Sequence, residues 1–122
     1  MVLIDANVIL RYVLKDNFEM AQRVEDLLKT NKVYVGFEVI AEVVYVLEKV
    51  YKVERNEIVN TLRVFFSHIS ISVESNEVLD TSLSLFDTSK LDFVDTVLYA
   101  KNRVYGYDVF TFDKKLNALL QS

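Results

Sequence analysis

Short apolar segments alternate with longer amphipathic ones along the chain, and this alternation constrains the fold more than any other feature. Residues 2–4, 33–36, 69–73 and 109–112 have the length and the β-branched or aromatic character of strands. The stretches between them carry apolar residues at helical spacing. Strands joined through helices favour a parallel sheet covered by helices. The sequence therefore predicts an α/β fold, a three-layer α/β/α sandwich with a mostly parallel sheet of four to five strands.

The expected helices follow from the apolar period and from residues that cap helix ends. They cover residues 7–15, 16–29, 37–51, 57–67, 77–87, 93–104 and 114–120. Asp16, followed by Glu19, resembles a capping box at the start of the second helix. Gly106 suits a left-handed cap after the sixth helix.

Composition leaves carboxylates as the main groups available for chemistry. The chain has 122 residues, enough for one hydrophobic core, so we expect a single domain over residues 1–122. It contains no cysteine, which excludes disulfides, thiolate metal sites and cysteine nucleophiles. His68 is the only histidine, and its apolar neighbours indicate a structural role. The two glycines are far apart, so no glycine-rich loop can bind a phosphate.

Charge and hydropathy bear on the cellular location of the protein and on nucleic-acid binding. The longest apolar run, residues 43–47, is much shorter than the roughly 20 residues of a membrane span. The N-terminus lacks the basic flank of a secretory signal, so we expect a cytoplasmic protein without a membrane partner. The net charge of −4 weakens the case for a basic nucleic-acid surface, although bound cations can invert the sign of an acidic cluster.

Three segments place aspartates where a strand is expected to end or a helix to begin. Asp5 and Asp113 follow expected strands, and Asp92 and Asp95 stand three apart at the start of a helix. Ligands of open α/β sheets bind beyond the carboxyl ends of the strands. Taken singly, each aspartate is explained as a helix cap or as part of an acidic first turn. Glu42 shares a helix face with other polar residues, and its period alone indicates a solvent-exposed stripe.

Crowded carboxylates would have a recognisable chemistry. Two unit charges about 4 Å apart repel by roughly 4 kcal/mol at an effective dielectric of 20. A cluster of them therefore takes up protons or binds a cation. Hard cations such as Mg²⁺ or Mn²⁺ match ligands made only of oxygen.

The order of four segments resembles that of the PIN-domain ribonucleases, in particular the VapC-type toxins of toxin–antitoxin pairs. The segments are Ile-Asp-Ala-Asn-Val at residues 4–8, the glutamate segment at residues 40–47, Leu-Asp-Phe-Val-Asp at residues 91–95 and Phe-Thr-Phe-Asp at residues 110–113. By this resemblance the catalytic and metal-binding residues are Asp5, Glu42, Asp95 and Asp113, with Asp92 as an added metal ligand, and Asn7 and Thr111 support them by hydrogen bonds.

The same resemblance implies a Mg²⁺- or Mn²⁺-dependent endoribonuclease that acts on structured RNA such as tRNA. It also implies a VapB-type antitoxin as protein partner and a homodimer. Four basic residues flank the expected site and could contact RNA phosphates, or they are ordinary solvated charges: Arg11, Lys15, Lys114 and Lys115.

Two other hypotheses stay open on the sequence. A phosphatase of the haloacid-dehalogenase type also places an aspartate after its first strand, but that family needs a second aspartate where this chain has Asn7. The other hypothesis is a non-catalytic RNA-binding scaffold with the same fold.

Overall fold

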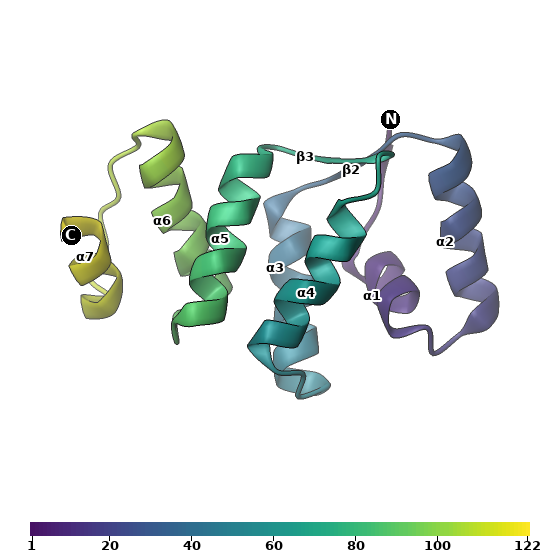
Figure 1. Ribbon diagram of the computed structural model, residues 1–122, viewed down its shortest axis with the longest axis horizontal. Helices are drawn as coiled ribbons and strands as arrows, with labels where there is room; N and C mark the ends of the chain where they lie inside the picture. The colour runs from purple at the N-terminus through teal and green to yellow at the C-terminus, as the bar shows by residue number, and fades with distance from the viewer. The chain divides into compact units, whose positions relative to one another are not determined.

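Three short parallel strands organise the first part of the chain (Figure 1). The computed structural model describes residues 1–122 as two compact units, Met1–Glu74 and Ser75–Ser122, and each is described by itself. In the first unit, β1 (Val2–Leu3), β2 (Val33–Val35) and β3 (Ile71–Val73) pair in that order. Val33 stands at the centre of this register, opposite Val2 on one side and Ile71 on the other.

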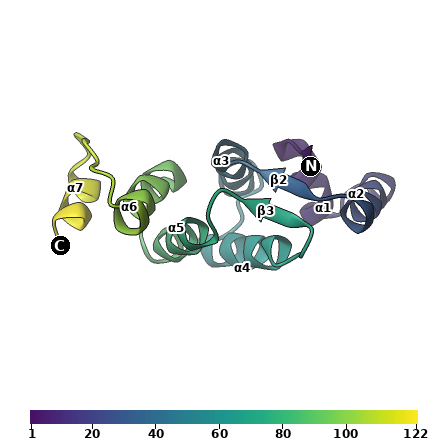
Figure 2. The ribbon, with the colours of Figure 1, turned by 90° about the horizontal axis from the view of Figure 1, so that it is seen from above.

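Four helices and one π-helical turn complete the first unit. They are α1 (Ala6–Leu14), α2 (Phe18–Thr30), α3 (Phe37–Tyr45), η1 (Val46–Val50) and α4 (Arg55–Phe66). Figure 2 shows α3 beside β2 and α4 beside β3, while α1 packs against α2 and α3. Apolar side chains from the strands and helices form the core, including the fully buried Val33, Ile40 and Leu62.

Two helices of the first unit, α1 and α2, begin at side chains that accept backbone N–H groups. Asp5 caps α1, because its Oδ1 accepts from the backbone N of Val8 at 3.1 Å. The expected capping box at Asp16 is wrong, since Asn17 caps α2 by accepting from the backbone N of Met20. Asp16 instead forms an ion pair with Arg11 at 2.8 Å, a local contact across the left-handed C-cap at Lys15 that ends α1.

The second unit is entirely helical. It consists of α5 (Asn76–Thr88), α6 (Phe93–Tyr105) and α7 (Lys114–Gln121). Phe86 and Leu116 are fully buried in its core, and the buried hydroxyl of Thr96 donates to the carbonyl of Phe93. The helix α6 ends at Gly106, whose φ of 75° confirms the expected left-handed cap. None of the helices in either unit has the length and apolar character needed to cross a membrane.

The expected strand at residues 109–112 does not form, so the sheet has three strands and not four to five. Phe110 and Phe112 are 87% and 90% exposed, and local bonds satisfy part of the backbone here. The backbone N of Asp113 donates to Thr111 Oγ1, and the Asn117 side chain donates to the Thr111 carbonyl. The α/β class and the parallel sheet are confirmed. Two expectations stay predictions, because they depend on both units together. These are the three-layer α/β/α arrangement and the single domain over residues 1–122.

Candidate functional site

Asp5 and Glu42 line one cavity in the first unit. The cavity has a volume of about 210 Å³ and is lined by Asp5, Ala6, Asn7, Leu10, Glu42 and Val46. Asp5 reaches it from the N-cap position of α1, two residues after β1 ends, and Glu42 reaches it from α3. Two of the expected acidic residues, which are far apart in sequence, therefore come together with Asn7 in this unit.

The Glu42 carboxylate has no hydrogen bond or ion pair, although its helix is firmly held. Ile40, Val43 and Val44 of α3 are buried, whereas Glu42 lies on the exposed face that its period predicts. The helix widens into η1 one turn later, where the backbone N of Tyr51 donates to the carbonyl of Val46. Val46 lines the acidic cavity, so this π-helical turn borders the cavity directly. Such turns occur frequently at functional sites.

The remaining expected carboxylates line one cavity in the second unit. Its volume is about 270 Å³, and it is lined by Lys90, Leu91, Asp92, Asp95, Asp113, Lys114 and Lys115. Asp92 is the N-cap residue of α6, yet its side chain makes no capping bond. Asp95 projects from the first turn of the same helix, and Asp113 is the N-cap residue of α7.

The electrostatics of this second cavity act most strongly on Asp95. Burial raises the pKa of the Asp95 carboxyl above its ordinary value, and the charges of Asp113 and Asp92 raise it further. Asp95 is half-buried and makes no hydrogen bond that would offset these effects. A cation bound beside these carboxylates would reverse their repulsion.

Asp113 is held in place by its own helix and by Thr111. Its Oδ1 accepts from the backbone N of Leu116 at 2.8 Å, which caps α7. Its backbone N donates to Thr111 Oγ1 at 3.0 Å, and the side chain of Asn117 donates to the Thr111 carbonyl at 2.8 Å. Thr111 therefore orients the residue that the resemblance expects it to support. Asn7, by contrast, makes no side-chain hydrogen bond.

The four expected RNA-binding cations separate into two groups. Lys114 and Lys115 line the acidic cavity of the second unit. Arg11 and Lys15 do not line the acidic cavity of the first unit. Arg11 lines a cavity between α1 and α2, and its side chain donates to Asp16 and Tyr51.

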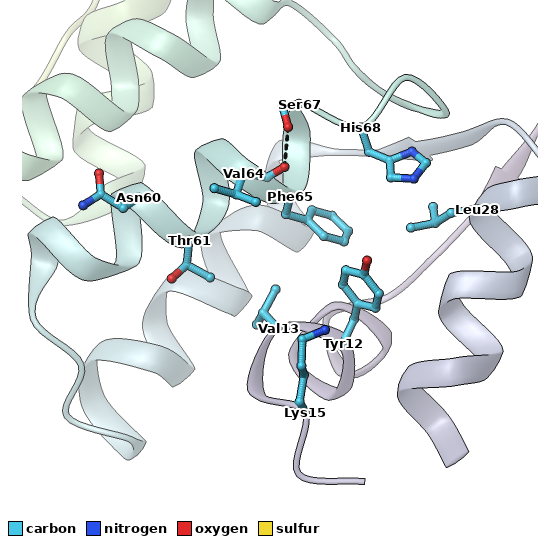
Figure 3. A pocket seen from close by; sticks show the side chains of 10 residues that line it. All are labelled: Tyr12, Val13, Lys15, Leu28, Asn60, Thr61, Val64, Phe65, Ser67 and His68. Carbon is cyan, nitrogen blue, oxygen red and sulfur yellow. Dashed lines mark hydrogen bonds between the residues drawn. The ribbon is translucent and has the colours of Figure 1, made fainter. Parts of the chain in front are cut away.

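Lys15 lines another cavity of the first unit, which has a volume of about 610 Å³ and is lined by no carboxylate (Figure 3). Its Nζ lies 4.5 Å from the ring centre of Tyr12, and that ring packs edge-on against Phe65. A hydrogen bond to Glu25 raises the pKa of Tyr12 to about 12, so this hydroxyl stays protonated. The lining of this cavity therefore differs in chemistry from that of the acidic cavity.

Two cations at these cavities were not expected from the sequence. Lys90 lines the acidic cavity of the second unit, and Arg23 lines the cavity that contains Arg11. The position of Lys90, two residues before Asp92, was a usable signal. Nothing in the sequence around Arg23 distinguishes it from other exposed charges of an amphipathic helix.

The donor set fits a hard divalent cation in its chemistry, because every expected ligand is a carboxylate. Neither unit by itself brings three or more aspartate, glutamate or histidine side chains close enough to hold a metal ion together. Glu42, Asp92 and Asp95 have carboxylates without any protein partner. Asp5 and Asp113 each use one oxygen for a helix cap and keep the other free.

Comparison with known protein families is consistent with this acidic chemistry. A family model for the PIN domain matches residues 2–119, which span both units. No curated protein and no solved structure matches the chain. PIN domains are generally nucleases that use divalent metals, and this supports a nuclease-type function. Because the family model matches residues 2–119, the chain belongs to the PIN-domain family.

Proposed function

We propose that this chain is a metal-dependent endoribonuclease that hydrolyses RNA phosphodiester bonds. The observation that carries the proposal is that the five acidic residues line cavities and that most of their carboxylate oxygens have no partner in the protein. They line two cavities, and three of them, Glu42, Asp92 and Asp95, have no hydrogen bond or ion pair within the protein. Unpaired carboxylates in a family of metal-using nucleases are the groups expected to bind the metal.

The five acidic residues are the proposed metal ligands. Asp5, Glu42, Asp92, Asp95 and Asp113 would hold one or two Mg²⁺ or Mn²⁺ ions. Such an ion, when bound, lowers the pKa of a water molecule and offsets charge on the reacting phosphate.

Free carboxylates and nearby cations supply the rest of the proposed mechanism. Glu42 and Asp95 have carboxylate oxygens available to orient a water molecule or to accept its proton. Lys90, Lys114 and Lys115 provide positive charge for RNA phosphates beside the second acidic cavity.

We further propose that the chain is the toxin of a VapBC-type pair, acts in the cytoplasm on structured RNA such as tRNA, and forms a homodimer. An exposed aromatic pair of the second unit supports a protein interface, since the ring centres of Phe110 and Phe112 lie 5.3 Å apart and the residues are 87% and 90% exposed. Two observations together would support the pairing. A reading frame directly upstream would encode a small DNA-binding protein, and that protein would copurify with this chain. A chain that remains monomeric and captures no such protein would contradict it.

The direct test is cleavage of purified tRNA by the wild-type chain with Mg²⁺ and with EDTA. We expect Mg²⁺-dependent cleavage that Asp95→Asn lowers by at least about 100-fold. Asp87→Asn is the matched control, because Asp87 is exposed in the same unit and lines neither acidic cavity.

The alternatives give different outcomes in the same assay. Cleavage that is equal in Mg²⁺ and EDTA, or unaffected by Asp95→Asn, would contradict the proposed mechanism. RNA binding without any cleavage would instead identify a non-catalytic scaffold. The haloacid-dehalogenase hypothesis has lost its support, because the family match assigns the chain to PIN domains.

A further inference from the structure

A second cavity of the first unit places positive charge next to the Asp5 and Glu42 cavity. It lies between α1 and α2 and has a volume of about 340 Å³. Its polar lining residues are Asn7, Arg11 and Arg23, and its apolar ones are Val8, Met20, Val24 and Leu27. Asn7 also lines the cavity of Asp5 and Glu42, so the basic and the acidic cavity share this residue.

The polar lining residues have hydrogen-bond donors that the protein leaves unused. Arg11 donates from Nη1 to Asp16 and from Nη2 to Tyr51, but its Nε is buried and has no partner. Arg23 is exposed and makes no hydrogen bond or ion pair. The Asn7 amide has no hydrogen-bond partner either. An oxygen-rich anion in the cavity would supply acceptors to the exposed side chains of Arg23 and Asn7 and to the second N–H groups on Nη1 and Nη2 of Arg11.

We propose that the α1/α2 cavity is a subsite for one nucleotide of a single-stranded RNA, next to the nucleotide whose bond is cleaved. This inference rests on the proposed nuclease function. The phosphate binds to Arg23 and to the unused donors of Arg11 and Asn7, and the base or ribose packs against Met20 and Val8.

The lining favours RNA over an acidic peptide. Charged phosphates and apolar base faces alternate along single-stranded RNA, and this cavity places guanidinium donors beside an apolar wall. The shared Asn7 connects the subsite to the proposed catalytic carboxylates. An acidic peptide would satisfy the cations but would not need that connection.

The test measures binding of a short fluorescein-labelled single-stranded RNA by anisotropy in EDTA, which prevents cleavage. Arg23→Gln is compared with Lys29→Gln, because both residues are exposed cations of α2 but only Arg23 lines the cavity. We expect Arg23→Gln to weaken binding about fivefold and to reduce the slope of log K against log salt by about 0.7. Lys29→Gln should bind as the wild type does.

Each other outcome overturns the inference in a recognisable way. Equal losses in both variants would indicate general electrostatic attraction. A loss of polyglutamate binding in Arg23→Gln, with RNA binding unchanged, would assign the cavity to an acidic protein. If the wild type cleaves RNA in Mg²⁺ and Arg23→Gln changes neither RNA binding nor KM, the subsite is wrong and the nuclease stands. If the wild type neither binds nor cleaves RNA, the proposed function fails as well.

Discussion

At the scale of single residues, a substitution can separate the helix cap that Asp5 forms from its proposed catalytic role. Its Oδ1 caps α1, whereas its Oδ2 has no hydrogen-bond partner. Asp5 also lines the acidic cavity of the first unit. Sequence reasoning offered the cap and the acidic site as alternatives for this residue. The geometry is compatible with both at once, because a carboxylate has two oxygens and the cap uses only one of them.

Two substitutions of Asp5 should therefore differ in stability but agree in activity. Asp5→Asn keeps a good capping residue and should unfold at nearly the wild-type temperature, whereas Asp5→Ala should lose about 1 kcal/mol of unfolding free energy. Both should lose RNA cleavage, since neither retains the charge. Urea titration and a cleavage assay on the same preparations check this. An active Asp5→Asn variant would show that Asp5 is only a cap.

Asp95 should make the stability of the protein depend on pH. Its pKa is raised in the folded chain, so the folded state binds more protons than the unfolded state between the two pKa values. Stability contributed by this group therefore falls as pH rises through that interval, and the loss is complete above the folded pKa. Asp95→Asn should therefore raise the thermal midpoint at pH 7, and this gain should disappear below the ordinary pKa of an aspartate, about 3.9.

Divalent cations provide the control for the Asp95 prediction. Mg²⁺ or Mn²⁺ should raise the thermal midpoint of the wild type more than that of Asp95→Asn, because the variant lacks one of the proposed carboxylate ligands. Asp87→Asn should behave as the wild type at each pH and metal concentration. An Asp95→Asn variant less stable than the wild type at pH 7 would contradict the assigned repulsion.

At the scale of elements, local periodicity located the helices well but failed where distant partners decide the structure. The helices α4, α5, α6 and α7 agree with their expected ranges to within two residues. The expected strand at residues 109–112 has the right alternation but no strand beside it, and alternation does not specify a partner. The π-helical turn after α3 has no sequence signal at all, since it continues the same apolar period.

The two glycines test how helix ends are specified. Gly106 has φ 75°, and a Cβ there would meet no atom within 4 Å, so Gly106→Ala should cost only backbone strain, about 1 kcal/mol or about 4 °C in thermal midpoint. Gly36 has an ordinary φ of −78°, and an added Cβ would displace only the flexible end of the Glu38 side chain. Gly36→Ala should therefore stay within about 0.5 kcal/mol of the wild type. Equal effects in differential scanning calorimetry would contradict this account.

At the scale of the whole molecule, the acidic residues are distributed over both units, and the PIN-domain match spans both. Residue patterns alone left Asp5, Asp92, Asp95 and Asp113 as helix caps or first-turn charges, and Glu42 as part of a solvent-exposed stripe. The family resemblance supplied their common role. Neither source of inference placed the cations, because exposed lysines and arginines are compatible with almost any surface position. The separation of Arg11 and Lys15 from the acidic cavity therefore had to come from the structure.

We propose that Asp5 and Asp95 serve the same hydrolytic reaction, and a double-mutant cycle tests this proposal most directly. We would measure kcat/KM for Mg²⁺-dependent RNA cleavage by the wild type, Asp5→Asn, Asp95→Asn and the double variant. Residues that act as a unit are strongly non-additive, so each single change should cost at least about 100-fold and the double change little more. Full activity in either single variant, or losses that multiply in the double variant, would contradict the claim.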